Sequence, residues 1–326
     1  MKALTIASAV LAAGLFGAGQ AGAQDAAATY PNTTVKIIVP YNAGGSTDTL
    51  GRLLAQELSE RYKQSFVVEN RAGAGGNVGT TALAQSAPDG YTLGMGTVAT
   101  HAINPTLWGA KSPYKITDFA PISQVAVVPN ILMVHPDVKA NTIPELIELL
   151  KKSPGELNYA SSGTGTSQHL ATELFKTMSG TDMVHVPYKG SSESLKDFLG
   201  GRIQVMIDNS PSALPQVQAG RGRALGVATA QRMPELPDVP TIGEFLPGYE
   251  AVSWQAFYAP AGTPPAIVNK LSTAVREILT DPEVVERLKK AGVTPAGTTP
   301  EALAAHMEKE ATKWAKVIKD SGAKIE

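Results

Sequence analysis

Short apolar runs alternate with helical patterns along most of the chain, and this alternation is the feature that most restricts its fold. Residues 35–39 predict a buried strand, and the four leucines between 50 and 58 share one face of a helix. Further strands are predicted at 65–69 and 91–98. Strands and helices in this order form βαβ units, which favour a mainly parallel sheet with helices on its faces.

The same order returns later in the chain. Residues 157–160 predict a strand, and a helix is expected over about 167–178. Further strands are expected at 183–186, 203–207 and 224–228. The roughly 300 residues after the N-terminal segment exceed the size at which one hydrophobic core stops growing. We therefore expect an α/β protein of two lobes.

Two stretches are candidates for carrying the chain between the lobes. One is the long apolar run 121–136, which contains Pro129, and the other is the loop-rich stretch 233–260. Two crossings would build the first lobe from both ends of the chain. The expected division is lobe 1 at 30–124 and 250–326, and lobe 2 at 125–249.

The N-terminus has the parts of a secretory signal peptide, expected at residues 1–23. Lys2 precedes an apolar stretch over 4–19, and Ala21-Gly22-Ala23 offers a small-residue cleavage site. A buried helix or a membrane anchor is the alternative, but the stretch is short of the ~20 apolar residues of a membrane span. The absence of cysteine excludes a lipoprotein anchor and a disulfide framework. We expect a soluble protein in a bacterial periplasm.

Charge and motifs exclude several functions. The formal net charge of -1 provides no basic surface field for nucleic acid. Zinc-protease, nucleophile-elbow and phosphate-loop motifs are absent from the sequence. The histidines show no metal-ligand spacing: His101, His135, His169, His185 and His306. We expect no enzyme activity, metal or cofactor, although an exported hydrolase using Ser162 and His169 stays open because catalytic groups meet in space.

Two loops rich in glycine and hydroxyl residues each join a predicted strand to a predicted helix. They are Tyr41–Asp48 and Ser161–Thr166, the second followed by Gln168 and His169. A helix start has free N–H groups and a partial positive charge, so a carboxylate can bind there without a cationic side chain. One such loop could be an ordinary capped turn. Two of them, one in each lobe, suit a carboxylate ligand held between the lobes.

Two other loops are less specific. Residues 186–192 also lie between a strand and a helix, and Lys189 could pair with a carboxylate or lie in solvent. The glycine run 70–79 resembles a dinucleotide fingerprint, but Val78 occupies the third glycine position. We expect this run to be a structural loop that brings a strand and a helix close together.

Helix signals are clear in the C-terminal third. Thr263-Pro264, Asp281-Pro282 and Thr299-Pro300 each place a capping residue before a proline at the first helical position. The last helix carries large apolar residues, such as Leu303 and Trp314, near one face. It is expected to be a packing helix whose charged residues face solvent.

Six segments in order resemble the solute-binding receptors of tripartite tricarboxylate transporters, the Bug or TctC-like group. The resemblance covers essentially the whole chain after the N-terminal segment. It implies a type II-like periplasmic binding fold whose lobes close on a ligand, and delivery to a transporter with large and small integral membrane subunits. The segments are 40–48, 70–79, 88–93, 161–170, 186–190 and 259–264.

The resemblance also implies ligands and site residues. Family ligands are mostly carboxylates: citrate-like, dicarboxylic, aromatic and some acidic amino acids. The first loop would hold one carboxylate, and the second loop would close over it with Tyr188. The candidates are Tyr41, Gly45, Ser46, Thr47, Asp48, Thr97, His101, Asn104, Ser162, Gly163, Thr164, Thr166, His169, Tyr188, Lys189 and Asp208.

Three points stay open at this level. Trp254 could be a cleft wall or a residue of a lobe crossing, and Asp208 could line the far side of the cleft. The receptor, expected to be a monomer, could present its ligand to a membrane histidine kinase instead of a permease. The same fold would serve both roles.

Overall fold

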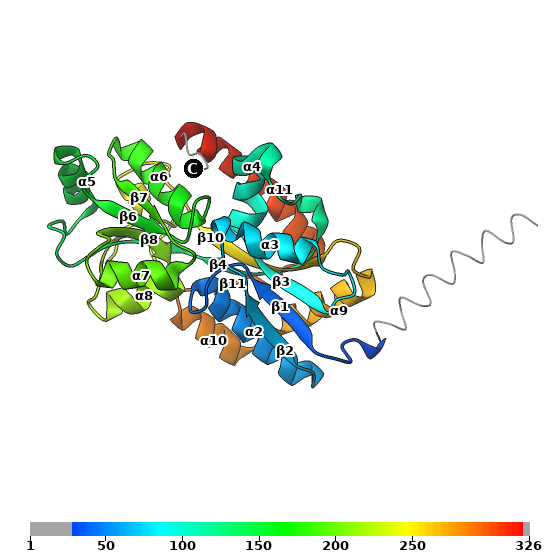
Figure 1. Cartoon of the computed structure of the whole chain (residues 1–326). Coiled ribbons are helices and arrows are strands. Elements are labelled where there is room, and N and C mark those ends of the chain that lie inside the picture. The colour runs from blue at the N-terminus through cyan, green and yellow to red at the C-terminus, as the bar shows by residue number, and fades with distance from the viewer. Residues whose placement is uncertain (1–27, 322–326) are drawn as a thin grey trace, which may run out of the picture.

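The structure is a computed structural model that describes residues 28–321. The expected signal peptide lies outside these residues. Two α/β lobes lie side by side, as Figure 1 shows, and each is built on one sheet with helices packed against it. Within residues 28–321, no helix is both long and apolar enough to span a bilayer.

The first lobe contains a six-stranded sheet in the order β11-β4-β10-β3-β1-β2. β1 pairs in parallel with β2 and β3. β10 pairs antiparallel with β3 and β4, and β11 pairs antiparallel with β4. The strands are β1 (Val35–Val39), β2 (Phe66–Asn70), β3 (Thr92–Thr97), β4 (Phe119–Val128), β10 (Ser253–Pro260) and β11 (Thr294–Pro295).

The second lobe contains a five-stranded sheet in the order β7-β6-β8-β5-β9. β6 pairs in parallel with β7 and β8, whereas β5 pairs antiparallel with β8 and β9. The strands are β5 (Asn130–Val134), β6 (Asn158–Ser161), β7 (Val184–Pro187), β8 (Val205–Asn209) and β9 (Arg223–Val227).

The two-lobe α/β architecture is confirmed, but both sheets are mixed rather than mainly parallel. The strands of the βαβ units run parallel, as the sequence predicted. The strands next to the lobe crossings, β4, β5 and β10, pair antiparallel with their neighbours. β5 and β10 are the strands by which the chain enters each sheet after a crossing, and each runs opposite to the βαβ strand beside it, which makes the sheets mixed.

Both expected crossings contain strands. The run 121–136 consists of most of β4 and all of β5, which belong to different sheets and are separated by Pro129 alone. The stretch 233–260 was predicted to be loop-rich, but it ends in β10, which lies between β3 and β4 in the first sheet and is buried along its whole length. The lobe boundaries near 125 and 250 remain a prediction.

The helices cover the sheets, and the first turns of three of them contribute residues to the pocket described below. α9 begins one residue later than its Thr-Pro signal indicated, whereas Asp281 and Thr299 cap the helices that follow them. Single turns η1 (Ala74–Gly76) and η2 (Ala99–Ile103) flank α3 and α4. The helices are α2 (Ser46–Tyr62), α3 (Asn77–Ala84), α4 (Asn104–Trp108), α5 (Ile143–Lys152), α6 (Ser167–Ser179), α7 (Ser191–Leu199), α8 (Ser210–Gln218), α9 (Pro265–Ile278), α10 (Pro282–Lys290) and α11 (Pro300–Ser321).

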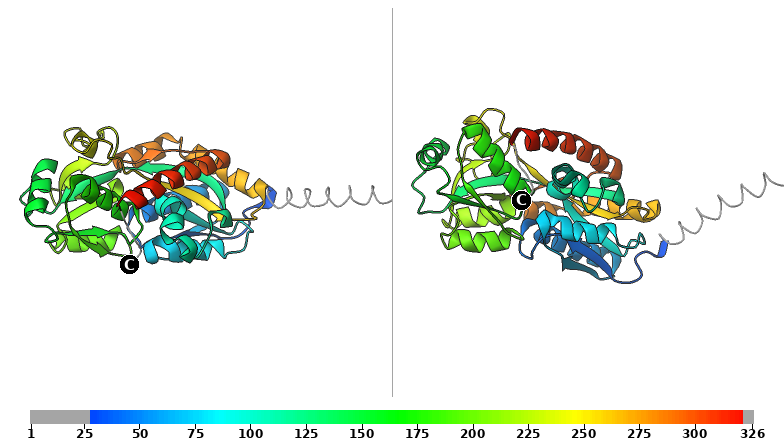
Figure 2. Two further views of the ribbon diagram at one scale, coloured as in Figure 1. Left: turned by 90° about the horizontal axis from the view of Figure 1, so that it is seen from above. Right: turned by 45° about the horizontal axis from the view of Figure 1, so that its top comes forward.

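The last helix joins the lobes as well as covering the first. Figure 2 shows α11 running along one face of the molecule, and it packs against β4 of the first lobe and α6 of the second. The largest buried apolar cluster includes Trp314 of α11, Trp254 of β10 and Leu132 of β5, so it is continuous across both lobes. The carboxylate of Glu310 is buried here, although the sequence placed the charges of this helix in solvent.

Candidate functional site

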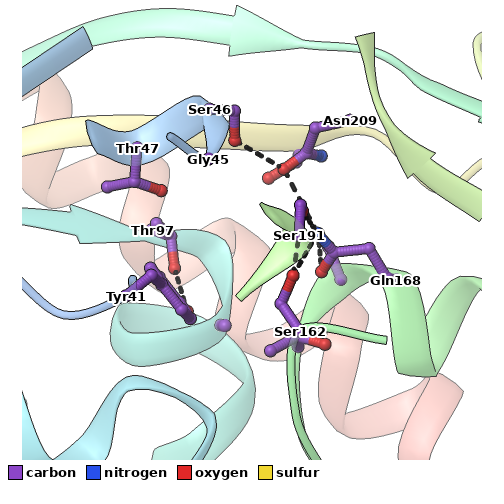
Figure 3. Close-up of a pocket in the computed structure, with 13 residues that line it drawn as sticks. Tyr41, Gly45, Ser46, Thr47, Thr97, Ser162, Gln168, Ser191 and Asn209 are labelled. Atoms are coloured by element: carbon purple, nitrogen blue, oxygen red, sulfur yellow. Dashed lines mark hydrogen bonds between the residues drawn. The ribbon is translucent and has the colours of Figure 1, made fainter. Parts of the chain in front are cut away.

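A small polar pocket lies between the lobes and is walled by both. Figure 3 shows its residues converging from helix starts and strand ends. The cavity measures about 20 Å³, which is about the room that one water needs. The lobes are therefore in a closed arrangement. The pocket is lined by Tyr41, Gly45, Ser46, Thr47, Thr97, Ala99, Ser162, Thr166, Ser167, Gln168, Ser191, Asn209 and Ser253.

The first-lobe wall is centred on the start of α2. Gly45 is the N-cap residue, and no side chain caps the first turn. The free N–H groups of this turn and the hydroxyl groups of Ser46 and Thr47 therefore form a cluster of donors at the pocket. Ser46 Oγ also accepts a hydrogen bond from Gln255 Nε2 of β10, at 3.1 Å.

Asp48 holds this loop in shape. Its Oδ2 accepts hydrogen bonds from the Gly44 N–H and from Arg52 Nε, each at 2.9 Å. Its Oδ1 accepts one from Asn70 Nδ2, also at 2.9 Å. Burial alone would raise the pKa of Asp48, but these hydrogen bonds together lower it. The carboxylate is therefore ionised and points into the loop, away from the pocket lining.

A phenol and a threonine complete this wall. Tyr41 Oη lies 3.2 Å from Thr97 Oγ1 and donates to the Gly75 carbonyl at 3.3 Å. Burial raises the pKa of Tyr41 to about 12, so its hydroxyl keeps its proton at neutral pH. The residues of this wall that line the pocket are thus uncharged.

The second-lobe wall is organised around Asp208, which is completely buried behind it. Its Oδ1 accepts from Ser191 Oγ at 2.8 Å, from Gln168 Nε2 at 3.1 Å and from the Asn209 N–H at 2.8 Å. Burial raises the pKa of Asp208. Ser162 Oγ continues the network, 3.0 Å from Ser191 Oγ and 3.1 Å from Gln168 Nε2.

Direct hydrogen bonds cross the cleft. Ser46 Oγ donates to Asn209 Oδ1 at 3.0 Å, as Figure 3 shows. The Asn42 N–H donates to the Lys189 carbonyl at 3.3 Å, and Asn42 Nδ2 donates to Glu193 Oε1 at 2.5 Å. The loop that was predicted to be purely structural also contacts the other lobe, because Gly75 lies against the Thr164 carbonyl.

Seven of the sixteen residues proposed from the sequence line the pocket, and the other nine are outside its lining. The Lys189 carbonyl accepts the hydrogen bond from the Asn42 N–H described above, and Tyr188 donates its hydroxyl hydrogen to Asp197 at 2.6 Å. Asn104 Nδ2 donates to the Gly75 carbonyl and to Asn77 Oδ1. The lining residues are Tyr41, Gly45, Ser46, Thr47, Thr97, Ser162 and Thr166; the residues outside the lining are Asp48, His101, Asn104, Gly163, Thr164, His169, Tyr188, Lys189 and Asp208. Their contact with ligand stays a prediction.

The histidines behind the pocket are neutral. His101 stacks on Tyr258 with ring centroids 3.9 Å apart, and burial lowers its pKa to about 3. His169 accepts from the Gly165 N–H at 3.2 Å through Nδ1, stacks on His185, and has a pKa lowered by burial to about 4. Among the hydrogen bonds of the described residues, none joins Ser162 to His169, so the pairing that a hydrolase would need is not formed.

Sequence reasoning left several lining residues out of the site. Ser191 and Gln168 lie in or next to the predicted loops, whereas Asn209 is the neighbour of the candidate Asp208. Ser253 begins β10, a strand that was not predicted. Asn209 follows a predicted strand directly, and a polar residue in that position was the sequence signal that could have indicated a place at the pocket. The residues missed are Ala99, Ser167, Gln168, Ser191, Asn209 and Ser253.

Two α/β lobes that close on a buried polar pocket define the class of periplasmic solute-binding proteins. The family model described as the tripartite tricarboxylate transporter family receptor, TctC, matches residues 50–323. The chain therefore belongs to the TctC family, which is a family of solute-binding receptors and not an enzyme class.

Relatives and solved structures agree with this assignment. BugT of Bordetella pertussis is 39% identical over 300 residues, which are 91% of this chain and 92% of that protein. A protein of R. palustris solved with adipate is 41% identical with a TM-score of 0.88, over 91% of this chain and all of that one. MatC from Rhodopseudomonas palustris with bound malate is 32% identical with a TM-score of 0.85, over 89% of this chain and all of that one.

Proposed function

We propose that this protein is exported to the periplasm, binds a small carboxylate between its lobes and delivers it to a transporter with large and small integral membrane subunits. The observation that carries the proposal is the uncapped start of α2, whose donors face the pocket together with Ser46 and Thr47. None of the thirteen described residues lining the pocket is Lys or Arg. The anion would thus be held by uncharged donors.

This arrangement suits reversible capture. A buried ion pair would require desolvation of two charges, whereas helix-start amides and hydroxyls are already oriented when the carboxylate arrives. A cavity of about 20 Å³ is far smaller than a dicarboxylate, so the lobes separate to admit the ligand and then close on it. The solved relatives bound to adipate and malate support a carboxylate as ligand.

Removal of both hydroxyls at the start of α2 tests the site. Ser46→Ala with Thr47→Ala should weaken carboxylate binding by about 1–3 kcal/mol, because a buried charged group loses hydrogen-bond partners. A thermal-shift screen of di-, tri- and aromatic carboxylates identifies a ligand, since one present at about 100 times its Kd adds about 2.7 kcal/mol of stability. Calorimetry then compares the variants.

Thr49→Ala is the matched control, because Thr49 is exposed on the same helix and its hydroxyl donates only to the Gly45 carbonyl. Its affinity should equal that of the wild type. An unchanged affinity in the double variant would refute the site assignment. A screen in which none of the carboxylates shifts the melting temperature would refute the proposed ligand class.

A further inference from the structure

We propose that the ligand carries a hydrogen-bond donor, namely a hydroxyl, an ammonium or an amide N–H, beside the carboxylate that binds at α2, and that Asn209 accepts from this donor. This inference rests on the proposed function and narrows its ligand class. It follows from the direction of the hydrogen bonds that lead from the lobe crossings to the pocket.

The side-chain amide of Asn209 has one permitted orientation. The Ala251 carbonyl, in the second crossing, can only accept a hydrogen bond, so it faces Asn130 Nδ2 at 2.7 Å. Asn130 Oδ1 is then directed to Asn209 and accepts from its Nδ2 at 2.6 Å. The oxygen of the Asn209 amide is consequently the atom that faces the pocket and Ser46, as Figure 3 shows. Asn130 is completely buried and acts as a positioning residue.

A second fixed acceptor orients the rest of this wall. Asp208 Oδ1 takes the hydroxyl hydrogen of Ser191, so Ser162 is the donor in its own contact with Ser191. The two hydrogens of Gln168 Nε2 are directed to Ser162 Oγ and Asp208 Oδ1. The side-chain hydrogens of the wall are thus used within the protein, and its oxygen lone pairs are available to a ligand.

Ligand entry breaks the bond between Ser46 and Asn209. Because the closed cavity holds about 20 Å³, a carboxylate can only be accommodated if these two side chains move apart. The Ser46 hydroxyl is then released to donate to the carboxylate. Asn209 Oδ1, in a residue that is 4% exposed, then loses its 3.0 Å donor and keeps only the long 3.5 Å contact from Gln168 Nε2. A ligand donor restores this bond, whereas a second carboxylate oxygen would face another acceptor.

The test compares ligands that differ only in the donor. Calorimetry on the whole protein measures succinate against malate and aspartate, and glutarate against 2-hydroxyglutarate and glutamate. The best donor-bearing member of one series should bind at least roughly tenfold more tightly than its plain counterpart, which is the worth of one good hydrogen bond. Comparison of the hydroxy acids with the amino acids then shows whether a hydroxyl or an ammonium group is the preferred donor.

Variants of Asn209 and Asn130 test whether the preference for donor-bearing ligands depends on Asn209 Oδ1. Asn209→Leu removes the acceptor, and Asn130→Ala releases the amide to rotate, so both should bring the affinity ratio close to one. Asn130→Ala keeps the test decisive if Asn209→Leu fails to fold, because it leaves Asn209 in place and removes only the partner of its Nδ2. Asn141→Ala is the control, because this asparagine is exposed and far along the chain from the pocket residues.

The outcomes separate the two proposals. Equal affinities for plain and donor-bearing ligands in the wild type overturn the inference and leave the proposed carboxylate function intact. A preserved preference in both Asn209→Leu and Asn130→Ala also overturns it, because another group would then be responsible. Binding by none of the six acids, together with no response in the wider carboxylate screen, refutes the proposed function itself.

Discussion

The contact between two glycine loops determines how closely the lobes can approach. Gly75 has a left-handed backbone with φ +61° and lies directly against the Thr164 carbonyl of the other lobe. A Cβ at this position would overlap that carbonyl oxygen. On the facing loop, Gly163 adopts φ +122°, which is also accessible mainly to glycine. Closure at this edge of the cleft therefore requires glycine at both positions, because a side chain would hold the two loops apart.

Substitution of Gly75 should therefore impair ligand binding. Gly75→Ala should weaken the affinity for the best carboxylate by roughly tenfold or more, because the closed arrangement becomes sterically blocked. Gly180→Ala is the matched control, since Gly180 has φ +63° and no atom near its added Cβ. Both variants should lose about 1 kcal/mol of stability from the left-handed backbone. Equal affinities in the two variants would show that this contact is not needed.

The sequence predicted the residues of the pocket unevenly. Ser46, Thr47 and Ser162 follow from a local rule, because a glycine-rich loop before a helix exposes N–H groups wherever it occurs. Asn209 and Gln168 do not, since their position at the pocket depends on how β8 and α6 meet in space. The role of Gly75 was missed for the same reason: its partner lies in the other lobe.

At the scale of elements, α11 is attached to the second crossing by a buried carboxylate. Glu310 Oε2 accepts hydrogen bonds from the indole nitrogens of Trp254 and Trp314, each at 3.1 Å. Both indoles are almost completely buried. These hydrogen bonds attach α11, which contacts both lobes, to the start of β10. There the chain re-enters the first sheet.

Loss of this carboxylate should destabilise the fold. Glu310→Ala leaves two buried indole N–H groups without partners and should lower the free energy of unfolding by about 2–4 kcal/mol. Urea denaturation measures the difference. Glu308→Ala, an exposed site on the same helix, should lie within about 0.5 kcal/mol of the wild type. Similar losses at both positions would contradict the proposed attachment.

Periodicity predicted the elements of the βαβ units and failed at β10. Strands β1, β6 and β8 are short runs bounded by loop residues, and their predicted positions agree to within two residues. β10 mixes polar and apolar residues because Ser253 lines the pocket and Gln255 contacts Ser46, while both faces of the strand are buried. A strand buried on both faces lacks the two-residue alternation that identifies half-buried strands.

For the whole molecule, buried neutral histidines make stability depend on pH. The pKa values of His101 and His169 are lowered to about 3 and about 4, against about 6.5 in an unfolded chain. Below pH 6.5 the unfolded chain therefore binds more protons than the folded protein, so acid lowers stability. The raised pKa of Asp208 acts in the opposite direction, because there the folded protein binds the extra proton.

A variant isolates the contribution of one histidine. His101→Phe keeps a ring to stack on Tyr258 and removes the titrating group. Relative to this variant, the wild type should lose about 1.4 kcal/mol of stability for each pH unit between 6.5 and 4. Urea denaturation at pH 7, 6, 5 and 4 measures both proteins. Parallel curves would contradict the lowered pKa of His101.

The position of β10 between β3 and β4 has a consequence for the order in which the two sheets form as the chain is synthesised. All five strands of the second sheet lie between residues 130 and 227, so that sheet can form as soon as this stretch has emerged. The first sheet cannot, because β3 and β4 keep unpaired edges until residues 253–260 arrive. Such edges are sites of mispairing and aggregation. The sheet that begins first along the chain is therefore completed last, and during that interval its unpaired edges are the part of the chain most exposed to mispairing.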